Sequence, residues 1–238
     1  VRTDAAALWA TGRTWWQVPP NAKVELIGKL KKGVTGKDVI ITLCGLFNHD
    51  EVLNHVLEFT GNGIADLSID ERLTIANMTT EWGALAGVFP TDGVIIQWLK
   101  DRADFISKRG LEGVVSDTYG KNGVHPRLNY DKINDLENNP TKANEKAFYT
   151  KEIKLDLNTV SPHISGPNHV KTMNSLHAAV GKNIKIDKAY LVSCVNSRVE
   201  DLAEAAKTIK GKQVASHVEF YITAASSEVQ AVSETRGE

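Results

Sequence analysis

The chain has 238 residues and a nearly balanced charge, with 28 Lys and Arg against 29 Asp and Glu and a formal net charge of −1. This balance argues against nucleic acid or an anionic membrane as a partner, and the longest apolar stretch, residues 39–47, is far shorter than a membrane span. Two cysteines exclude a disulfide framework.

The first elements are short. The sequence predicts a helix over residues 3–10, a strand over 15–18 that the Pro19-Pro20 pair ends, and a second strand over 22–27. Thr35 lies three residues before Asp38, a spacing typical of a helix start, and we expect a helix in the sequence DVIITLC.

Two more helix starts follow in the same half of the chain. Asn48 with Glu51 predicts a helix in EVLNHVLEF, and the capping box from Ser68 to Glu71 predicts a longer one that Pro90 closes. A further helix is expected over residues 92–108.

Residues 110–149 are polar and rich in turn residues, which favours a connecting segment with up to two short helices between two domains. The sequence IKLDLNTV at 153–160 alternates as a half-buried strand does, and we expect a loop over 161–170.

The last part of the chain has the most regular pattern. We expect a buried strand over residues 189–195, a capping box from Ser197 to Glu200 before a helix ending near 210, a second strand in SHVEFYITAA and a second helix in SSEVQAV. This βαβα order predicts an α/β fold with a parallel sheet.

Cys194 stands at the turn between a predicted strand and helix, which is where open parallel sheets place their ligands. Ser193 and Asn196 beside it are hydrogen-bonding residues. From the residues alone, a functional thiol and a buried packing residue both remain open for Cys194. Cys44 lies in an apolar run and is interpreted as a packing residue.

Asn77 and Glu81 are four residues apart, which places an amide and a carboxylate on one face of the helix predicted after Ser68. Such a pair can orient a water molecule or a substrate hydroxyl, and a polar stripe without function is the alternative. The histidines have no zinc-site spacing.

Four stretches of the chain together resemble the aconitase superfamily, and within it most closely the branch of fungal lysine biosynthesis. They are TDAAALWATGRTWWQVPP, GVTGKDVIITLCGLFNHDEVLNHVLEFTG, LTIANMTTEWGALAGVFPTD and LVSCVNSRVEDLAEAA, and SPHISGPNHV strengthens the assignment to that branch. Family members are much longer, so we expect an internal piece of a longer protein.

The resemblance implies aconitase-like three-layer α/β domains with parallel or mixed sheets. Residues 1–110 would form the second domain of the family, 111–150 a polar connecting segment, and 151–238 the start of the third domain. The remaining domains of the parent protein would be its partners. The resemblance also implies a mitochondrial location.

The activity that the resemblance implies is that of a hydro-lyase acting on a tricarboxylate through a four-iron, four-sulfur (4Fe-4S) cluster. Cys194 would be the first cluster ligand and thus the metal-binding residue, with Ser193 and Asn196 as cofactor-binding neighbours in the same motif. Asn77 and Glu81 would be the catalytic residues that approach the cluster.

Two departures from the family pattern limit what this chain can do alone. Val195 stands where the family usually has Thr, and the CxxC motif that supplies the other two cluster cysteines is absent from this sequence. We therefore expect the isolated chain to bind no stable cluster and to be inactive. The isopropylmalate dehydratase and aconitase branches remain alternatives for the parent, and a non-catalytic interaction or assembly module is the alternative from another class.

Overall fold

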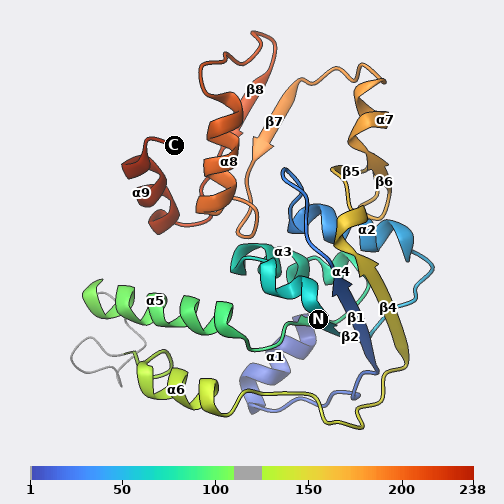
Figure 1. Ribbon diagram of the computed structural model, residues 1–238, viewed down its shortest axis with the longest axis vertical. Coiled ribbons are helices and arrows are strands. Elements are labelled where there is room, and N and C mark those ends of the chain that lie inside the picture. The colour runs from blue at the N-terminus through green and yellow to red at the C-terminus, as the bar shows by residue number, and fades with distance from the viewer. Residues whose placement is uncertain (1, 110–124) are drawn as a thin grey trace.

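A four-stranded parallel sheet forms the centre of the structure, a computed structural model that describes residues 2–109 and 125–238 (Figure 1). The strand order is β3-β2-β1-β4. The strands are β1 (Asn21–Ile27), β2 (Val56–Thr60), β3 (Ala86–Val88) and β4 (Lys151–Asp156). The strands expected at 22–27 and 153–160 are confirmed, the second ending early in a 3₁₀ helix, Leu157–Thr159.

The predicted α/β fold with a parallel sheet is therefore confirmed. β4 comes from beyond the connecting segment but pairs with β1, with Ala22 opposite Lys151. The sheet thus takes strands from both sides of residues 111–150, and the division of the chain into domains stays a prediction.

The main core lies on one face of this sheet. Every second residue of β1 is buried there, and Ala22, Val24 and Leu26 have no exposed surface. They belong to one apolar cluster with residues of α2 (Gly36–Leu46) and α3 (Ile69–Asn77). The alternation follows from the two-residue period of a strand.

α2 begins as the sequence predicts. The backbone N–H of Thr35 donates to the Asp38 carboxylate at 2.9 Å. The other carboxylate oxygen of Asp38 accepts from the backbone N–H of His163 at 2.8 Å. One capping residue therefore also ties α2 to a segment more than a hundred residues away.

The helix expected after Asn48 is wrong, because the chain forms a turn and then β2. Glu51 does accept a hydrogen bond from the backbone of His49 at 2.7 Å. However, Asp50 and Asn54 have φ of 62° and 58°, which a continuing right-handed helix excludes. β2 then lies between β1 and β3, where pairing on both sides outweighs local helix propensity.

The long helix expected after Ser68 is also wrong beyond its first half. The capping box is confirmed, since Ser68 Oγ accepts from the backbone N–H of Glu71 at 3.2 Å. α3 then stops at Asn77, and a short helix α4 (Thr79–Trp82) ends at Gly83, whose φ of 106° is left-handed. β3 follows, so residues expected in the helix form a strand.

The helix expected over 92–108 is confirmed as α5 (Gly93–Arg109), which packs on α6 (Tyr130–Asn138) through Ile96, Ala103 and Ile133. α6 is one of the short helices expected in the connecting segment, and residues 110–124 of that segment lie outside the described residues.

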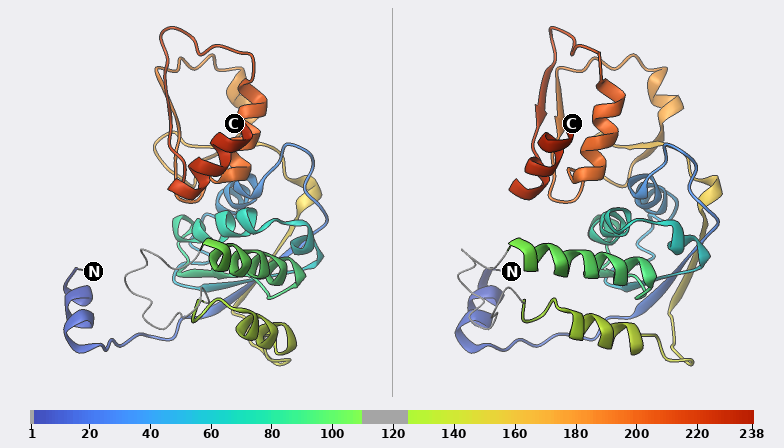
Figure 2. Two further views of the ribbon diagram at one scale, coloured as in Figure 1. Left: turned by 90° about the vertical axis from the view of Figure 1, so that its left-hand side faces the viewer. Right: turned by 60° about the vertical axis from the view of Figure 1, so that its left-hand side comes forward.

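The N-terminal helix α1 (Arg2–Thr11) confirms the helix expected at 3–10. It lies apart from the sheet (Figure 2). The strand expected at 15–18 is wrong, because this segment extends into solvent without a pairing partner; Trp15 is 90% exposed.

A small hairpin leads to the last part of the chain. β5 (His163–Ser165) pairs antiparallel with β6 (Met173–Ser175), and α7 (Leu176–Val180) follows. The loop expected over 161–170 is therefore partly a strand.

Earlier in the chain, a 3₁₀ helix, Asn62–Asp66, lies between β2 and α3.

The predicted βαβα unit is confirmed. β7 (Lys188–Leu191) and β8 (Glu219–Ile222) are parallel and alternate with α8 (Val199–Ile209) and α9 (Ser227–Arg236). Two details are wrong. β7 is shorter than 189–195 and not buried, with Tyr190 60% exposed, and α8 is capped at Arg198, whose backbone N–H donates to Asp201 at 3.1 Å.

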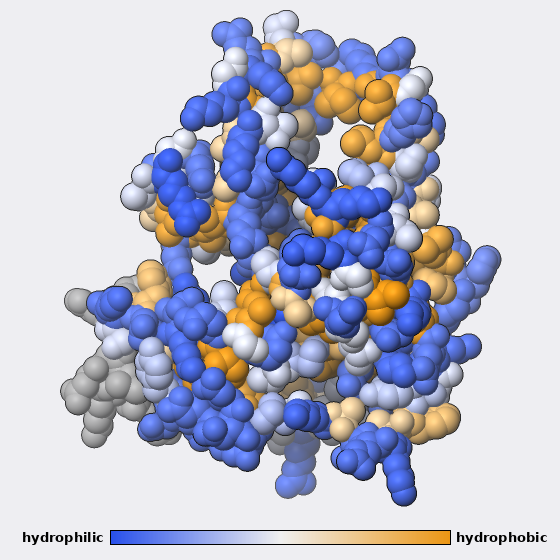
Figure 3. Space-filling model, in the orientation of Figure 1, coloured by the Kyte–Doolittle hydropathy of each residue, from blue (hydrophilic) through white to orange (hydrophobic). Residues whose placement is uncertain are grey.

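Apolar side chains also reach the surface near this unit. Val180 at the end of α7 and Ile184 and Ile186 between α7 and β7 are exposed, and Figure 3 shows apolar surface in that upper region. Over residues 2–109 and 125–238, no helix combines the length and apolar character that crossing a membrane requires.

Candidate functional site

The turn between β7 and α8 carries Cys194. The thiol is free and exposed, and the backbone N–H of Val195 donates to Ser193 Oγ at 3.0 Å. The turn follows the carboxyl end of a parallel strand, as the sequence predicts, so its side chains are in the usual position for ligand contact. Exposure of Cys194 disagrees with the packing alternative left open above.

Asn196, two residues further on, joins this turn to the sheet unit, by which we mean the four-stranded sheet with helices α2 and α3. Its Nδ2 donates to Thr74 Oγ1 at 3.0 Å, and its Oδ1 accepts from Lys37 Nζ at 3.3 Å. Thr74 is on α3 and Lys37 is in the first turn of α2. The side chain expected to be a cofactor neighbour is thus bound to two helices.

Two further polar contacts hold the start of α8 against the start of α3. Arg198 forms an ion pair with Asp70 at 2.9 Å, and Ser68 Oγ donates to Glu200 at 3.0 Å. A cleft of about 690 Å³ opens along this boundary, and its lining includes Ser193, Asn196 and Thr74. Ser193 and Asn196 therefore border a space large enough for a small ligand.

Asn77 and Glu81 do not share one helix. Asn77 is the last residue of α3 and is exposed, whereas Glu81 is half-buried in α4. Glu81 Oε2 is buried and has no hydrogen-bond partner among the described residues. A buried carboxylate oxygen without a hydrogen bond costs stability, so Glu81 differs in this respect from the other candidate site residues.

Cys44 is a packing residue, as its apolar surroundings predict. It is buried on α2, and burial, helped by the negative charge of Glu81, raises the pKa of its thiol to about 12. A thiol kept protonated in this way is a poor metal ligand.

The exposed thiol of Cys194 meets the requirement for one cysteine ligand of an iron–sulfur cluster. Within residues 2–109 and 125–238, no group of three His, Cys, Asp or Glu side chains converges on a common point. Since three thiolates hold a cluster that keeps one iron open, this chain supplies one ligand at most.

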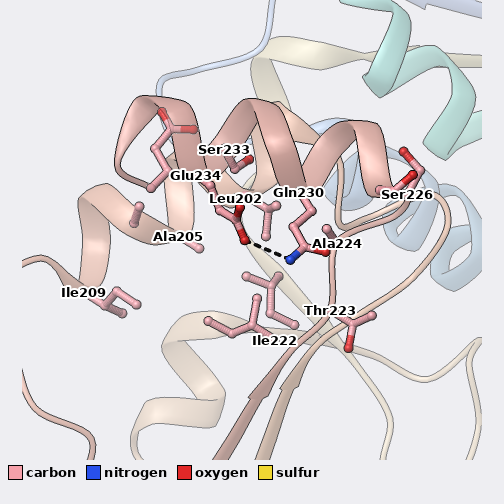
Figure 4. Close-up of a pocket in the computed structure, with 14 residues that line it drawn as sticks. Leu202, Ala205, Ile209, Ile222, Thr223, Ala224, Ser226, Gln230, Ser233 and Glu234 are labelled. Atoms are coloured by element: carbon pink, nitrogen blue, oxygen red, sulfur yellow. Dashed lines mark hydrogen bonds between the residues drawn. The ribbon is translucent and has the colours of Figure 1, made fainter.

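A second cavity, of about 480 Å³, lies between α8, α9 and the ends of β7 and β8 (Figure 4). Figure 4 shows aliphatic side chains at this cavity, among them Leu202, Ile209 and Ile222, together with polar residues of α9 such as Gln230 and Ser233. Gln230 donates to Glu234 at 2.8 Å along its wall. None of the predicted site residues lines this cavity, whereas Ser193 and Asn196 line the cleft of about 690 Å³. That cleft is therefore the better functional candidate, although Cys194, Asn77 and Glu81 line neither space.

Thr74 and Lys37 were not among the residues predicted for the site. Thr74 lies one helical turn before Asn77, which is a weak signal that it shares the same face. Nothing in the sequence shows that these side chains reach Asn196, because 122 and 159 residues separate the partners. Such contacts follow only from the packing of α8 against α2 and α3.

Comparisons with known proteins identify the family of the chain. The model of the aconitase family (aconitate hydratase) matches residues 1–238. The chain is 53% identical over 237 residues to a protein named mitochondrial homoaconitase from Debaryomyces hansenii. It is 54% identical over 239 residues to the one from Mycosarcoma maydis, and 53% over 238 residues to the one from Candida albicans. Each match covers 100% of this chain but 32–33% of the relative.

Proposed function

Because the chain belongs to the aconitase family, we propose that its parent protein is a mitochondrial hydro-lyase of lysine biosynthesis. It interconverts homocitrate, cis-homoaconitate and homoisocitrate by removing and re-adding water. The identity of 53–54% to mitochondrial homoaconitases along the whole chain supports this substrate class. The chain spans about a third of the length of these relatives, so the activity belongs to the parent.

Family membership implies a 4Fe-4S cluster in the parent protein. Cys194 would hold it from this chain, and the other two thiolates would come from the rest of the parent. When bound, such a cluster supplies a Lewis-acidic iron that polarises the hydroxyl to be eliminated. The single observation that carries the proposal is the exposed Cys194 thiol on a turn that Asn196 binds to α3, the helix that ends in Asn77.

The other candidate residues then have distinct tasks. Glu81 presents a buried, unpaired carboxylate oxygen, which suits it to take a proton from a hydroxyl or to return one. Asn77 is exposed at the end of α3, so its amide is free to orient a carboxylate or hydroxyl of the substrate. Substrate binding and the remaining acid–base residues would come from the other domains.

The proposal is tested by iron and sulfide analysis of the intact parent protein after anaerobic reconstitution. Cys194→Ser should lose the cluster, whereas the matched variant Cys44→Ser should keep it because Cys44 is buried in the main apolar cluster. The isolated 238-residue chain should retain no stable cluster. Four irons held by the Cys194→Ser parent, or by the isolated chain, would contradict the assignment.

The substrate is tested separately by hydratase assays of the parent with homoaconitate, aconitate and isopropylmalate. We expect the largest kcat/KM with homoaconitate. A preference for aconitate or isopropylmalate would assign the parent to another branch of the family, and a cluster-free parent inactive on all three would favour the non-catalytic module.

A further inference from the structure

The side-chain amide of Asn196 forms hydrogen bonds with two helices, one through its oxygen and one through its nitrogen. Its Oδ1 faces Lys37, a residue that only donates hydrogen bonds, so the orientation of the amide is settled and Nδ2 must face Thr74. Thr74 is 4% exposed. These bonds connect α2, α3 and the turn of Cys194, three segments that no covalent link holds together locally.

The bond to Thr74 couples the two halves of the candidate site. Thr74 is three residues before Asn77 on α3, and Asn196 is two residues after Cys194 on its turn. The hydrogen bond from Val195 to Ser193 stays within the turn, and Ser197 at its end accepts from the backbone N–H of Ala225 at 2.9 Å, so neither bond ties the turn to α3. A shift of the turn relative to α3 therefore has to break the bond between Asn196 and Thr74.

We propose that Asn196 is a positioning residue: its bonds to Thr74 and Lys37 hold the Cys194 turn at a set distance from the end of α3, and it does not itself contact the cofactor. The inference rests on the proposed function only in treating Cys194 as a ligand. The clasp, defined as Asn196, Thr74 and Lys37, exists in this chain without any cluster.

A matched pair of variants separates the hydrogen bond from packing. Thr74→Val keeps the shape of the side chain and removes the hydroxyl, whereas Thr74→Ser keeps the hydroxyl. We expect amide hydrogen exchange over residues 192–198 of the 238-residue chain to become about fivefold faster in Thr74→Val. In Thr74→Ser, the amide exchange rate should equal that of the unsubstituted chain. A nitroxide on Cys194 should become more mobile in the first variant only.

Asn196→Ala should reproduce Thr74→Val, and the double variant should add little because both changes remove the same bond. Asn139→Ala, on an exposed amide at the end of α6, is the control and should leave amide exchange over residues 192–198 unchanged. Unchanged exchange in Thr74→Val and Asn196→Ala overturns the proposal. So does a Thr74→Ser variant that behaves like Thr74→Val. If Asn196→Ala does not fold, the Thr74 pair decides alone.

The intact parent supplies the readout that a merely structural contact would not change. A chelator should bleach the cluster several-fold faster in Thr74→Val than in Thr74→Ser. Equal bleaching, with faster exchange of the turn, would overturn the positioning role. A parent without any cluster would instead refute the proposed function, and the exchange results would still decide whether the clasp exists.

Discussion

Arg72 is the most deeply buried charge in the part of the chain that the structure describes. Its side chain is 3% exposed and forms a two-bond ion pair with Asp92 at 2.8 and 2.7 Å. It also donates to the carbonyl oxygens of Leu67 and Ile64. Four bonds from one guanidinium join the segment before α3, α3 itself and the start of α5.

We predict that Arg72→Ala lowers the free energy of unfolding by about 2–3 kcal/mol, because it leaves a carboxylate and two carbonyls without their donor. Denaturant titration measures the change. Arg13→Ala, on an exposed residue, is the control. A loss no larger than that of Arg13→Ala would show that Asp92 and the carbonyls find water instead.

Glu71 gives the stability a pH dependence. Burial raises the pKa of its carboxyl above 4.5, the charge of Glu200 adds to this, and hydrogen bonds from Ser68 only partly oppose it. Since the folded pKa lies above the unfolded one, the stability contribution of Glu71 is full below the unfolded value and is lost as pH rises through the folded value.

Glu71→Gln keeps the oxygen that accepts the capping hydrogen bond. We therefore predict that, as pH rises from about 4 to 7, the free energy of unfolding of this variant increases relative to that of the unsubstituted chain. Urea titrations at several pH values test this. Glu145→Gln, on an exposed residue, is the matched control. A stability difference that stays constant across this range would refute the role given to Glu71.

At the scale of elements, charge pairs match the register of the sheet. Glu25 on β1 lies opposite Lys154 on β4 with 3.0 Å between the charged groups, and Lys23 lies opposite Glu152 at 2.6 Å. These residues occupy the face away from α2 and α3. A slip of one residue would bury them, so the pattern favours a single register.

We predict that Glu25→Lys destabilises the chain by about 0.5 kcal/mol, since it places like charges opposite each other, and that adding Lys154→Glu restores the loss. The two single variants and the double variant, compared in denaturant titrations, form a double-mutant cycle. Additive losses in the double variant would show that the pair does not interact.

At the scale of the whole molecule, the βαβα unit meets the sheet unit through polar contacts. Arg102 on α5 binds Glu228 on α9 at 2.6 Å, and Arg198 binds Asp70 at 2.9 Å. Among the described residues, the main apolar cluster contains none after Val160 and so stays within the part of the chain that forms the four-stranded sheet. Charged contacts between partly exposed groups weaken with salt, whereas an apolar core does not.

We predict that raising the salt concentration from about 0.1 to 1 M, which shortens the Debye length to about 3 Å, speeds amide exchange in α8 and α9. Exchange in α2 and α3 should not rise with it. Hydrogen-exchange mass spectrometry of the chain resolves these helices separately. Equal changes in both pairs of helices would show that the units are held together by more than these contacts.

Local signals in the sequence predict the α/β class of the fold and the strand-to-helix turn that carries Cys194. Capping pairs at Thr35 and Ser68, the regular βαβα pattern and the motif around Cys194 are local signals, and local backbone energetics carries them into the structure. The family resemblance, which also rested on sequence, agrees with the family match over the whole chain.

Features that depend on distant partners follow only from tertiary packing. β2 is a strand and not a helix because it pairs with β1 and β3, and α3 stops at Asn77 so that β3 reaches the sheet edge. Asn196 binds Thr74 and Lys37 from 122 and 159 residues away. Sheet pairing and long-range hydrogen bonds form only when the whole chain is packed, so no local pattern reveals them.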